Sequence, residues 1–375
     1  MRGSTLEDKL IGASGRPSGF DCMRIVLALI VLCLHSLTTS YGTGLDFAWD
    51  TWLYGPWLRL VLPMFFALSG FLVAGSFMRS KSIIHFLGLR FLRIYPALAV
   101  EVLLSALILG PIVTTVAFSQ YFGSEMFFRY LLNITGHIYY YLPGVFADNP
   151  YPNKVNGQLW TVPFELLCYI SLTAAVLVGF TKKRQFFMLA CLVMLIAYPI
   201  ARFFVHGGEL PVTATKVPGN VLVETFLWGV VCYQYRDRLP FGVIPFGVAL
   251  GISLALLSGL PMGEYFCAPF VAYLTVALGL LNPRRINFLQ GADYSYGVFL
   301  YHFAIQQAVV DLLPSLRTWW AVIAISLPAS ILVAAASWHF VEMPALKLKG
   351  WLPVHLPMPF IRDRRAEVAK EFGES

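Results

Sequence analysis

The sequence predicts an all-α fold, a polytopic transmembrane helical bundle of about ten spans with both termini in the cytoplasm. Of the 375 residues, 58% are hydrophobic and only 13% are charged, whereas about a quarter of the residues in ordinary soluble domains are charged. Apolar runs of about 20 residues, the length that crosses a hydrocarbon core of ~30 Å, recur from Met23 to Phe340. These runs leave no room for a large soluble domain.

Charges, prolines and glycines set the boundaries of the predicted spans. The spans lie near residues 20–40, 52–77, 95–118, 157–180, 186–205, 219–235, 241–259, 264–281, 295–313 and 319–341. We therefore expect a cytoplasmic N-terminal tail at 1–19, a transmembrane domain at 20–344 and a cytoplasmic C-terminal tail at 345–375. The first span follows a polar segment and lacks a small-residue cleavage site, so we expect it to be retained and not removed as a signal peptide.

The distribution of Lys and Arg predicts the orientation, because positively charged loops stay cytoplasmic. The two tails and the connections 78–94, 181–185, 236–240 and 282–294 hold 20 of the 27 basic residues, and the opposite connections hold four. The net charge of +7 follows from this asymmetry and from attraction to the lipid bilayer, and it requires no nucleic-acid partner. The six cysteines lie in or beside apolar spans without metal-ligand spacing, so we expect no metal site.

The first span carries ionisable residues on one helix face. Asp21 and Arg24 are three residues apart, and His35 follows Arg24 by 11 residues, which returns it to within about 20° of the same face and ~16 Å further along. A charge near the bilayer centre costs at least ~2.5 kcal/mol, so such residues are candidates for function. Alone, Arg24 would be a snorkelling anchor and His35 a packing residue. Their shared face favours function.

Motifs also mark the second and third spans. The second ends in Phe-Phe-Ala-Leu-Ser-Gly-Phe-Leu at 65–72, where the Ser-Gly pair allows helix backbones to approach closely. Before the third span, Arg90 and Arg93 lie three residues apart on one helix face, ahead of Pro96. Two guanidinium groups on one face make a fork for phosphate, whereas each arginine alone would be a topology signal.

The fourth, ninth and tenth spans carry further polar groups. Trp160 opens the fourth span, and Tyr169 follows Glu165 by one helical turn. The Glu165 carboxylate should face the bundle interior, where it could orient an imidazole, bind a cation or a sugar hydroxyl, or pair with a buried arginine. His302 lies within the ninth span, and Glu342 closes the tenth near the cytoplasmic boundary, where it could cap or pair.

The longest outward connection, roughly 119–156, is rich in aromatic and amide side chains. Aromatic faces pack on sugar rings while amides and short carboxylates satisfy hydroxyls, so this composition predicts carbohydrate binding. An interfacial aromatic belt explains the aromatic residues equally well. The residues concerned are Tyr139, Tyr140, Tyr141, Phe146, Asp148, Asn149, Tyr151 and Asn153.

Taken together, these motifs resemble the membrane-bound acyltransferase family 3, the O-acyltransferases of bacterial surface and exported carbohydrates. The resemblance runs from Asp21 to Pro344. It rests on six motifs in the family's order: Arg24 and His35 in Arg-x10-His, Phe-x-x-Ser-Gly-Phe-Leu at 66–72, Arg-x-x-Arg-Ile-x-Pro at 90–96, Trp160 with Glu165 and Tyr169, Ser295-Tyr296 with His302, and Glu342 with Pro344. Pro163 departs from the pattern, and no hydrolase-like domain follows the tenth span, so the membrane part, alone or with a partner, is expected to reach the acceptor.

The resemblance implies an acyl-CoA-dependent O-acyltransferase of the bacterial inner (cytoplasmic) membrane. Its donor would be cytoplasmic acyl-CoA, with acetyl-CoA favoured and succinyl as an alternative, and no cofactor would be permanently bound. Its carbohydrate acceptor would be a hydroxyl of a surface or exported polysaccharide, exopolysaccharide or lipopolysaccharide, or of a lipid-linked precursor. Polysaccharide biosynthesis or export proteins are candidate partners.

The resemblance also implies roles for single residues. His35 would be the general base, since its ordinary pKa of about 6.5 suits proton transfer near neutral pH. Glu165 would fix the His35 tautomer or hold the acceptor, and a covalent acyl-histidine is an alternative route. Arg24, Arg90 and Arg93 would bind the donor, and Trp160, Tyr169 and His302 would bind the acceptor.

Two other classes of function fit a bundle with buried ionisable residues. A transporter could use buried His, Glu and Arg side chains as a proton or solute pathway, but the sequence shows no inverted repeat and no paired broken spans. A subunit of a carbohydrate-export complex would tolerate His35→Ala without functional loss. Acyl transfer predicts instead that His35→Ala abolishes the product and leaves the protein folded.

Overall fold

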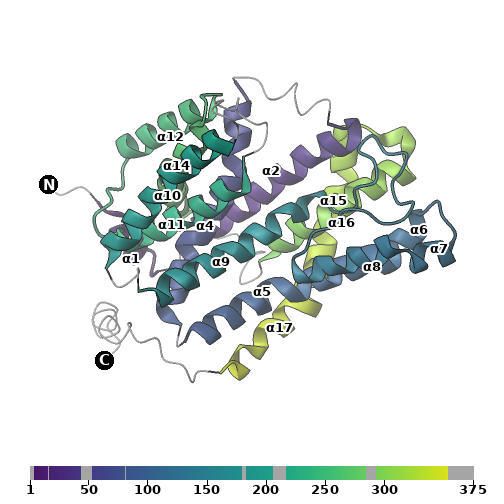
Figure 1. The fold of residues 1–375 in the computed structure, drawn as a ribbon, viewed down its shortest axis with the longest axis horizontal. Coiled ribbons are helices and arrows are strands. Elements are labelled where there is room, and N and C mark those ends of the chain that lie inside the picture. Colours follow the sequence, from purple (N-terminus) through teal and green to yellow (C-terminus); the bar gives the residue numbers. More distant parts are fainter. Residues whose placement is uncertain are drawn as a thin grey trace.

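The computed structural model describes residues 4–15, 17–43, 53–80, 82–179, 183–205, 217–283 and 293–353. Within these ranges the secondary structure is helical, with isolated bridge pairs and no strand. Figure 1 shows that many of the long helices run roughly along the long axis of the molecule. The predicted all-α class is confirmed.

Among the described residues, six helical stretches are long and apolar enough to cross a membrane. They are α2 (Gly19–Tyr41), α4 (Gly55–Arg79), Ile83–Val113, Gly157–Leu177, α10 (Arg184–Val205) and Trp319–Trp351. The other four predicted spans coincide with α11 (Gly219–Gln234), α12 (Val243–Leu257), α14 (Ala268–Gly279) and α15 (Tyr294–Leu312). Each predicted span therefore overlaps a helix, and a crossing of the bilayer by all ten stays a prediction.

The third span begins earlier than the sequence predicted. Helix α5 (Ile83–Leu104) runs without a break through Pro96 and continues through a π-helical turn (Ser105–Leu109) into α6 (Gly110–Val113). The expected boundary at residue 95 is therefore wrong, because a membrane helix tolerates an internal proline where neighbouring helices and local adjustments satisfy the freed carbonyl. Arg90 and Arg93 consequently belong to the long helix itself and not to a connection before it.

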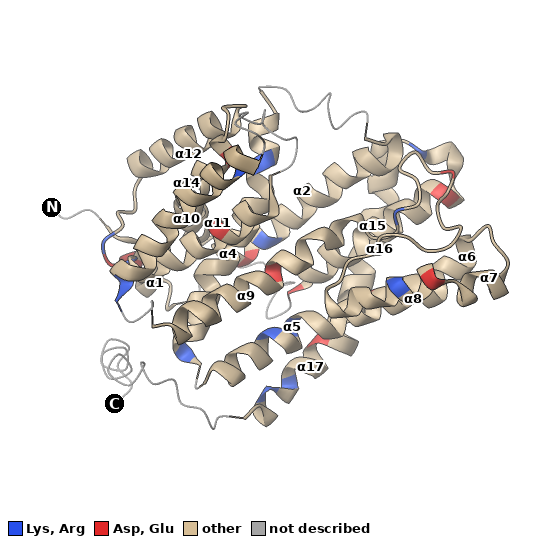
Figure 2. Cartoon of the chain, viewed as in Figure 1, with Lys and Arg blue, Asp and Glu red and all other residues tan. Residues whose placement is uncertain are grey.

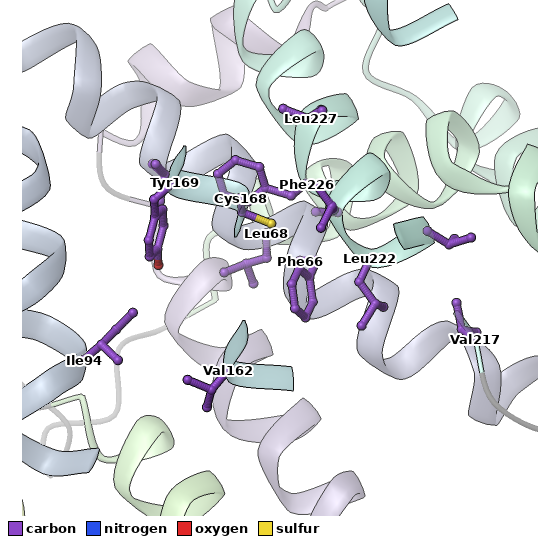
Figure 3. Packing of buried hydrophobic residues seen from close by; sticks show 14 of the residues in the cluster. Phe66, Leu68, Ile94, Val162, Cys168, Tyr169, Val217, Leu222, Phe226 and Leu227 are labelled. Atoms are coloured by element: carbon purple, nitrogen blue, oxygen red, sulfur yellow. The ribbon is translucent and has the colours of Figure 1, made fainter. Parts of the chain in front are cut away.

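Small residues bring α4 and α11 into close contact at the centre of the bundle. A Cβ atom at Gly70 would lie 2.0 Å from the carbonyl oxygen of Phe226, and one at Gly229 would lie 2.3 Å from that of Ala67. Side chains larger than hydrogen cannot occupy either position without separating the helices. Figure 3 shows Phe66 and Leu68 of α4 close to Leu222 and Phe226 of α11 in this core.

Pro163 is accommodated at the start of a helix. A 3-10 turn (Gly157–Thr161) leads into α9 (Val162–Leu177), and Pro163 lies in the first turn of α9. Proline is tolerated there because the first backbone N–H groups of a helix have no intrahelical acceptor. The departure from the family motif therefore leaves Trp160 and Glu165 on one continuous helical segment.

The connection after α6 folds into short helices at one end of the bundle. Helices α7 (Phe118–Gly123) and α8 (Glu125–Leu131) lie with α6 on the right of Figure 1, whereas α1 (Leu6–Gly12) lies at its left and α17 (Met343–Lys347) at its lower centre. Figure 2 shows both signs of charge around α1, near α17 and at α8. The even number of spans and the end that faces the cytoplasm both stay predictions.

Candidate active site

Helix α2 (Gly19–Tyr41) contributes one residue to each of the two groups that form the site. Arg24 lies near its beginning and His35 near its end, and the helix between them is unbroken. The predicted separation of ~16 Å along the helix axis therefore applies. We name the group of Arg24, Arg90, Arg93, Asp293 and Glu342 the arginine cluster, and we name His35 with His302 the histidine pair.

The arginine cluster joins four separate parts of the chain. The Asp293 Oδ2 atom accepts hydrogen bonds from Arg24 Nη1 at 2.6 Å and from Arg93 Nη2 at 2.5 Å. A second carboxylate holds Arg93 from the other side, since Arg93 Nη1 lies 3.1 Å from Glu342 Oε2. Glu342 is buried in a π-helical turn (Trp338–Glu342) that follows α16 (Trp319–Ser337). π-helical turns are frequent at functional sites.

Asp293 is the member of the cluster that sequence reasoning missed. It directly precedes α15, and Ser295 Oγ donates a hydrogen bond of 2.5 Å to its Oδ1 atom. Burial raises the pKa of Asp293, but the Arg93 and Arg24 guanidinium groups lower it more strongly, so that the pKa falls to about 2. Asp293 therefore stays ionised at neutral pH. The signal in the sequence was its position two residues before Ser295 of the Ser-Tyr motif.

Arg90 differs from the other two arginines in its partner. Its Nη2 atom lies 3.3 Å from the hydroxyl of Ser76. Among the described residues, no carboxylate oxygen lies within 4.0 Å of its guanidinium group. Arg24 and Arg93 thus form ion pairs with carboxylates, whereas Arg90 has the Glu165 carboxylate within electrostatic range and makes no ion pair with a described residue.

Glu165 and Tyr169 lie with the arginine cluster. The Tyr169 hydroxyl donates a hydrogen bond of 2.8 Å to Glu165 Oε1, and the Glu165 carboxylate is within electrostatic range of Arg93 and Arg90. Among the described residues no arginine forms an ion pair with Glu165 within 4.0 Å, so the direct partner of its carboxylate is Tyr169. The His35 ring, for its part, is hydrogen-bonded to His302.

The histidine pair fixes its own tautomers. His302 Nδ1 lies 3.0 Å from the Val298 carbonyl oxygen and 2.8 Å from that of Phe299. Carbonyl oxygens only accept, so Nδ1 carries the proton and Nε2 of neutral His302 is an acceptor. His35 Nδ1 lies 2.7 Å from this Nε2 atom and therefore donates to it. The tautomer assigned in this way leaves Nε2 of His35 as its basic nitrogen.

Contacts between α2 and α15 hold the pair in place. The two imidazole rings are stacked with centroids 5.0 Å apart. One turn after His302, the buried Gln306 donates a hydrogen bond of 2.8 Å to the Leu32 carbonyl oxygen of α2. Gln306 was not predicted, because its partner lies 274 residues earlier in the chain.

A cavity of about 550 Å³ reaches His35 from the end of the bundle opposite the arginine cluster. Its walls come from the last half of α2, the first half of α4, the start of the Gly157–Leu177 stretch and the connection before it. Trp160 lines the cavity, as expected for a residue assigned to the acceptor. His302 is hydrogen-bonded to His35 and is not part of the cavity lining. Tyr169 is hydrogen-bonded to Glu165 near the arginine cluster. His302 and Tyr169 therefore do not have the placement expected for acceptor binding.

The aromatic residues of the outward connection divide into two groups. Tyr140 and Tyr151 line the cavity. Phe146 is buried, and Asn149 donates hydrogen bonds to Gln307 of α15, so these two residues hold the connection against the bundle. The carbohydrate-binding interpretation therefore applies to a subset of these side chains, while Tyr141 is exposed as an interfacial residue would be.

Comparison with known proteins identifies the family. The model of the family described as "Acyltransferase domain" (acyltransferase family 3) matches residues 18–339. The chain is 27% identical over 359 residues to "Nodulation protein 10" of Rhizobium leguminosarum bv. viciae, an alignment that covers 90% of this chain and 95% of that protein. It is 24% identical over 345 residues to "O-acetyl transferase" of Shigella phage Sf6, with 86% and 94% of the two chains covered.

No solved structure matches this chain. The matched residues include the histidine pair and every member of the arginine cluster except Glu342. One relative is named for acyl transfer. Residues of these motifs meet in the structure, since Arg24, Arg93 and Ser295 share Asp293 as a partner and His35 is hydrogen-bonded to His302. The chain belongs to the acyltransferase family 3 and is a membrane acyltransferase.

Proposed function

We propose that the protein is an O-acyltransferase of the bacterial inner membrane, which moves an acyl group from cytoplasmic acyl-CoA to a carbohydrate hydroxyl. Acetyl is the favoured acyl group, because one relative is named "O-acetyl transferase". The acceptor belongs to a surface or exported polysaccharide or to its lipid-linked precursor. Both termini are cytoplasmic in this proposal.

The observation that carries the proposal is the position of His35. His35 lines a cavity formed in part by the second half of α2, whereas Arg24 lies near the beginning of the same helix. An acceptor hydroxyl entering the cavity would meet the basic Nε2 atom of His35. A thioester arriving from the arginine cluster would approach the same point from the other side.

The chemistry requires one base and no redox step. His35 Nε2 takes the proton of the acceptor hydroxyl while the hydroxyl oxygen attacks the thioester carbonyl carbon. The new C–O bond forms, the C–S bond breaks, and the thiolate leaves as the free thiol after it receives the proton from His35. His302 holds His35 in the reactive tautomer, which makes His302 a positioning residue in this mechanism. An acyl-histidine formed on the same Nε2 atom is the alternative route.

The arginine cluster is the proposed docking point for the phosphates of the donor. Arg90 is suited to bind phosphate directly, because guanidinium groups form strong charge-assisted hydrogen bonds with phosphate oxygens. Arg24 and Arg93 are held by Asp293, which fixes the positions of their guanidinium groups. The three arginines therefore have different proposed roles, whereas the sequence predicted that all three bind the donor.

The test compares esters in living cells. A strain lacking the chain is complemented with wild type, His35→Ala or His137→Ala, and the acyl content of surface and secreted polysaccharides is measured by mass spectrometry. His137 is an exposed histidine of the outward connection and serves as the matched control. We expect wild type and His137→Ala to restore one ester and His35→Ala to restore none at equal membrane levels. Full rescue by His35→Ala would refute the mechanism.

A further inference from the structure

The cavity that reaches His35 contains a lysine in an aromatic setting. Lys154 of the outward connection lines the cavity, and its Nζ atom donates a hydrogen bond of 2.9 Å to the Tyr151 hydroxyl. Nζ also lies 5.0 Å from the centroid of the Tyr151 ring and 5.1 Å from that of Tyr140. The two tyrosines therefore hold the ammonium group in one place through cation–π contacts.

Lys154 keeps its charge in this setting. Burial lowers the pKa of Lys154, but the hydrogen bond to Tyr151 and the neighbouring tyrosines raise it above its ordinary value. In the part of the chain that the structure describes, no carboxylate lies within ion-pair distance of Nζ. An ammonium group has three N–H donors, and one of them is used by Tyr151. A ligand in the cavity would meet the remaining two.

The other charged residues of the cavity wall add no negative charge. Arg59 and Arg202 line the cavity, and its described lining contains no Asp or Glu. Both arginines have contacts of their own, including the hydrogen bond of 2.6 Å from Arg59 Nη1 to the Leu257 carbonyl oxygen. Glu264 lies close enough to both to offset part of their charge. Lys154 is therefore the cation that a ligand would meet, and the two arginines only make the surroundings positively charged.

Three successive contacts connect Lys154 with His35. The His35 ring packs edge-on against Phe303 with centroids 5.1 Å apart, and Phe303 packs against Tyr151 at 6.1 Å. Tyr151 in turn holds Lys154. Aromatic faces are suited to the apolar faces of sugar rings. Phe303 is buried and serves as packing between His35 and Tyr151. A sugar lying on the partly exposed Tyr151, in the cavity that His35 also lines, would thus have one end at Lys154 and the other toward His35.

We propose that the acceptor is anionic and that its carboxylate or phosphate group binds Lys154 while its hydroxyl is presented to His35. This inference rests on the proposed function and narrows its substrate class to acidic glycans or glycans on a lipid diphosphate. The two sources share one chemistry, an anionic oxygen group accepting charge-assisted hydrogen bonds from an ammonium group. Neutral glycans without either group bind more weakly.

The experiment uses the full chain purified in detergent, with acetyl-CoA as donor and the lipid-linked glycan of the host as acceptor. The acceptor is used intact, after mild acid removal of its diphosphate, or after chemical reduction of its carboxylates to alcohols. Wild type is compared with Lys154→Gln, Lys154→Arg and Arg129→Gln. Arg129 is paired with Glu125 on the exposed face of α8, outside the cavity lining, and is the matched control.

We expect Lys154→Gln to raise the KM for the intact acceptor about 10-fold or more, since hydrogen bonds to charged groups are the strong ones. Lys154→Arg, which keeps the charge, should be affected less, and Arg129→Gln should match wild type. One of the two chemical treatments should reproduce the effect of Lys154→Gln in wild type. Loss at diphosphate removal would identify the lipid-linked phosphate, and loss at reduction would identify an acidic sugar.

The inference and the proposed function fail in different ways. Transfer that proceeds with the same KM on all three acceptors, or an unchanged KM in Lys154→Gln, would overturn the anionic acceptor and leave acyl transfer intact. Absence of any ester product with wild type on every acceptor, together with unchanged esters in the deletion strain, would instead refute the proposed function.

Discussion

Replacing His302 with Phe tests whether the histidine pair sets the chemistry of His35. The substitution keeps a ring between α2 and α15 but removes the nitrogen that accepts the proton of His35 Nδ1 across 2.7 Å. A buried donor without its acceptor costs about 1–3 kcal/mol. His35 can avoid that cost by rotating or by changing its tautomer, and both changes remove Nε2 from its reactive state. Since 1.4 kcal/mol is a factor of ten, the reactive population falls by about 5- to 150-fold.

The expected result is a fall of kcat within that range and a KM for acetyl-CoA that changes by less than about twofold, because the arginine cluster is untouched. His302→Gln places an amide oxygen near the former Nε2 atom, so it should recover part of the lost kcat. The assay is steady-state release of free thiol by the purified protein, with ester formation measured in parallel. His339→Phe, which removes an exposed imidazole bonded to Tyr294, is the matched control.

Two results would refute this reasoning. The first is a His302→Phe protein that keeps the wild-type kcat and is folded by thermal melting, because the hydrogen bond would then have no part in catalysis. The second is an equal loss in His302→Phe and His302→Gln with equal melting temperatures. That outcome would mean that the ring itself, and not its acceptor nitrogen, is required.

Three further predictions concern the arginine cluster and the helix contacts. Asp293→Asn removes a carboxylate shared by two guanidinium groups. Breaking a buried ion pair costs about 3–5 kcal/mol, and these pairs are partly exposed, with 22% exposure for Asp293, so a smaller cost and a fall of the melting temperature in detergent are expected; an unchanged value would contradict the assigned pairing. The pKa of Asp293 is lowered from its ordinary 3.8 to about 2, so the stabilisation by its carboxylate is fully present above pH 3.8 and is lost as the pH falls through about 2. The difference in melting temperature between wild type and Asp293→Asn should therefore stay constant from about pH 8 to pH 5 and shrink below about pH 4. A difference that already shrinks between pH 7 and pH 5 would show that the Asp293 carboxylate is not its source. Gly229→Ala places a methyl group against the Ala67 carbonyl and should destabilise the protein by about 1–3 kcal/mol. Gly251→Ala is the control, because its methyl group meets nothing within 4 Å. Equal melting temperatures of the two variants would contradict the close packing of α4 and α11.

The parts of the site that were predictable are those that depend on one helix. The common face of Arg24 and His35 follows from the helical repeat and needs no knowledge of neighbouring helices. The small-residue contact at Gly70 was equally local, because closely packed membrane helices use such residues. Both features are found in α2 and α4 as expected.

The parts that were missed depend on which helices are neighbours. The hydrogen bond between His35 and His302 joins residues 267 positions apart, and the one between Arg93 and Asp293 joins residues 200 apart. Sequence spacing shows neither, so His302 was assigned to the acceptor and Asp293 was overlooked. Glu165 was considered as a partner of His35 for the same reason, whereas its hydrogen bond is with Tyr169 near the arginines.

The arrangement of the two centres also bears on the choice between acyl transfer and transport. Buried ionisable residues suggested a solute pathway, but in this fold Arg24 and Arg93 at one end are held by Asp293 and Glu342, and the lining of the cavity at the other end includes no residue of the arginine cluster. A transporter must open this whole length to its solute. An acyltransferase with substrates on opposite sides needs to pass only a thioester arm along the ~16 Å from Arg24 to His35. The ion pairs that would obstruct a solute are therefore compatible with acyl transfer. A separate experiment on sugar flux, with His35→Ala as the comparison, distinguishes acyl transfer from transport. Acyl transfer requires the histidine, whereas a solute pathway through the arginine cluster requires the ion pairs to break.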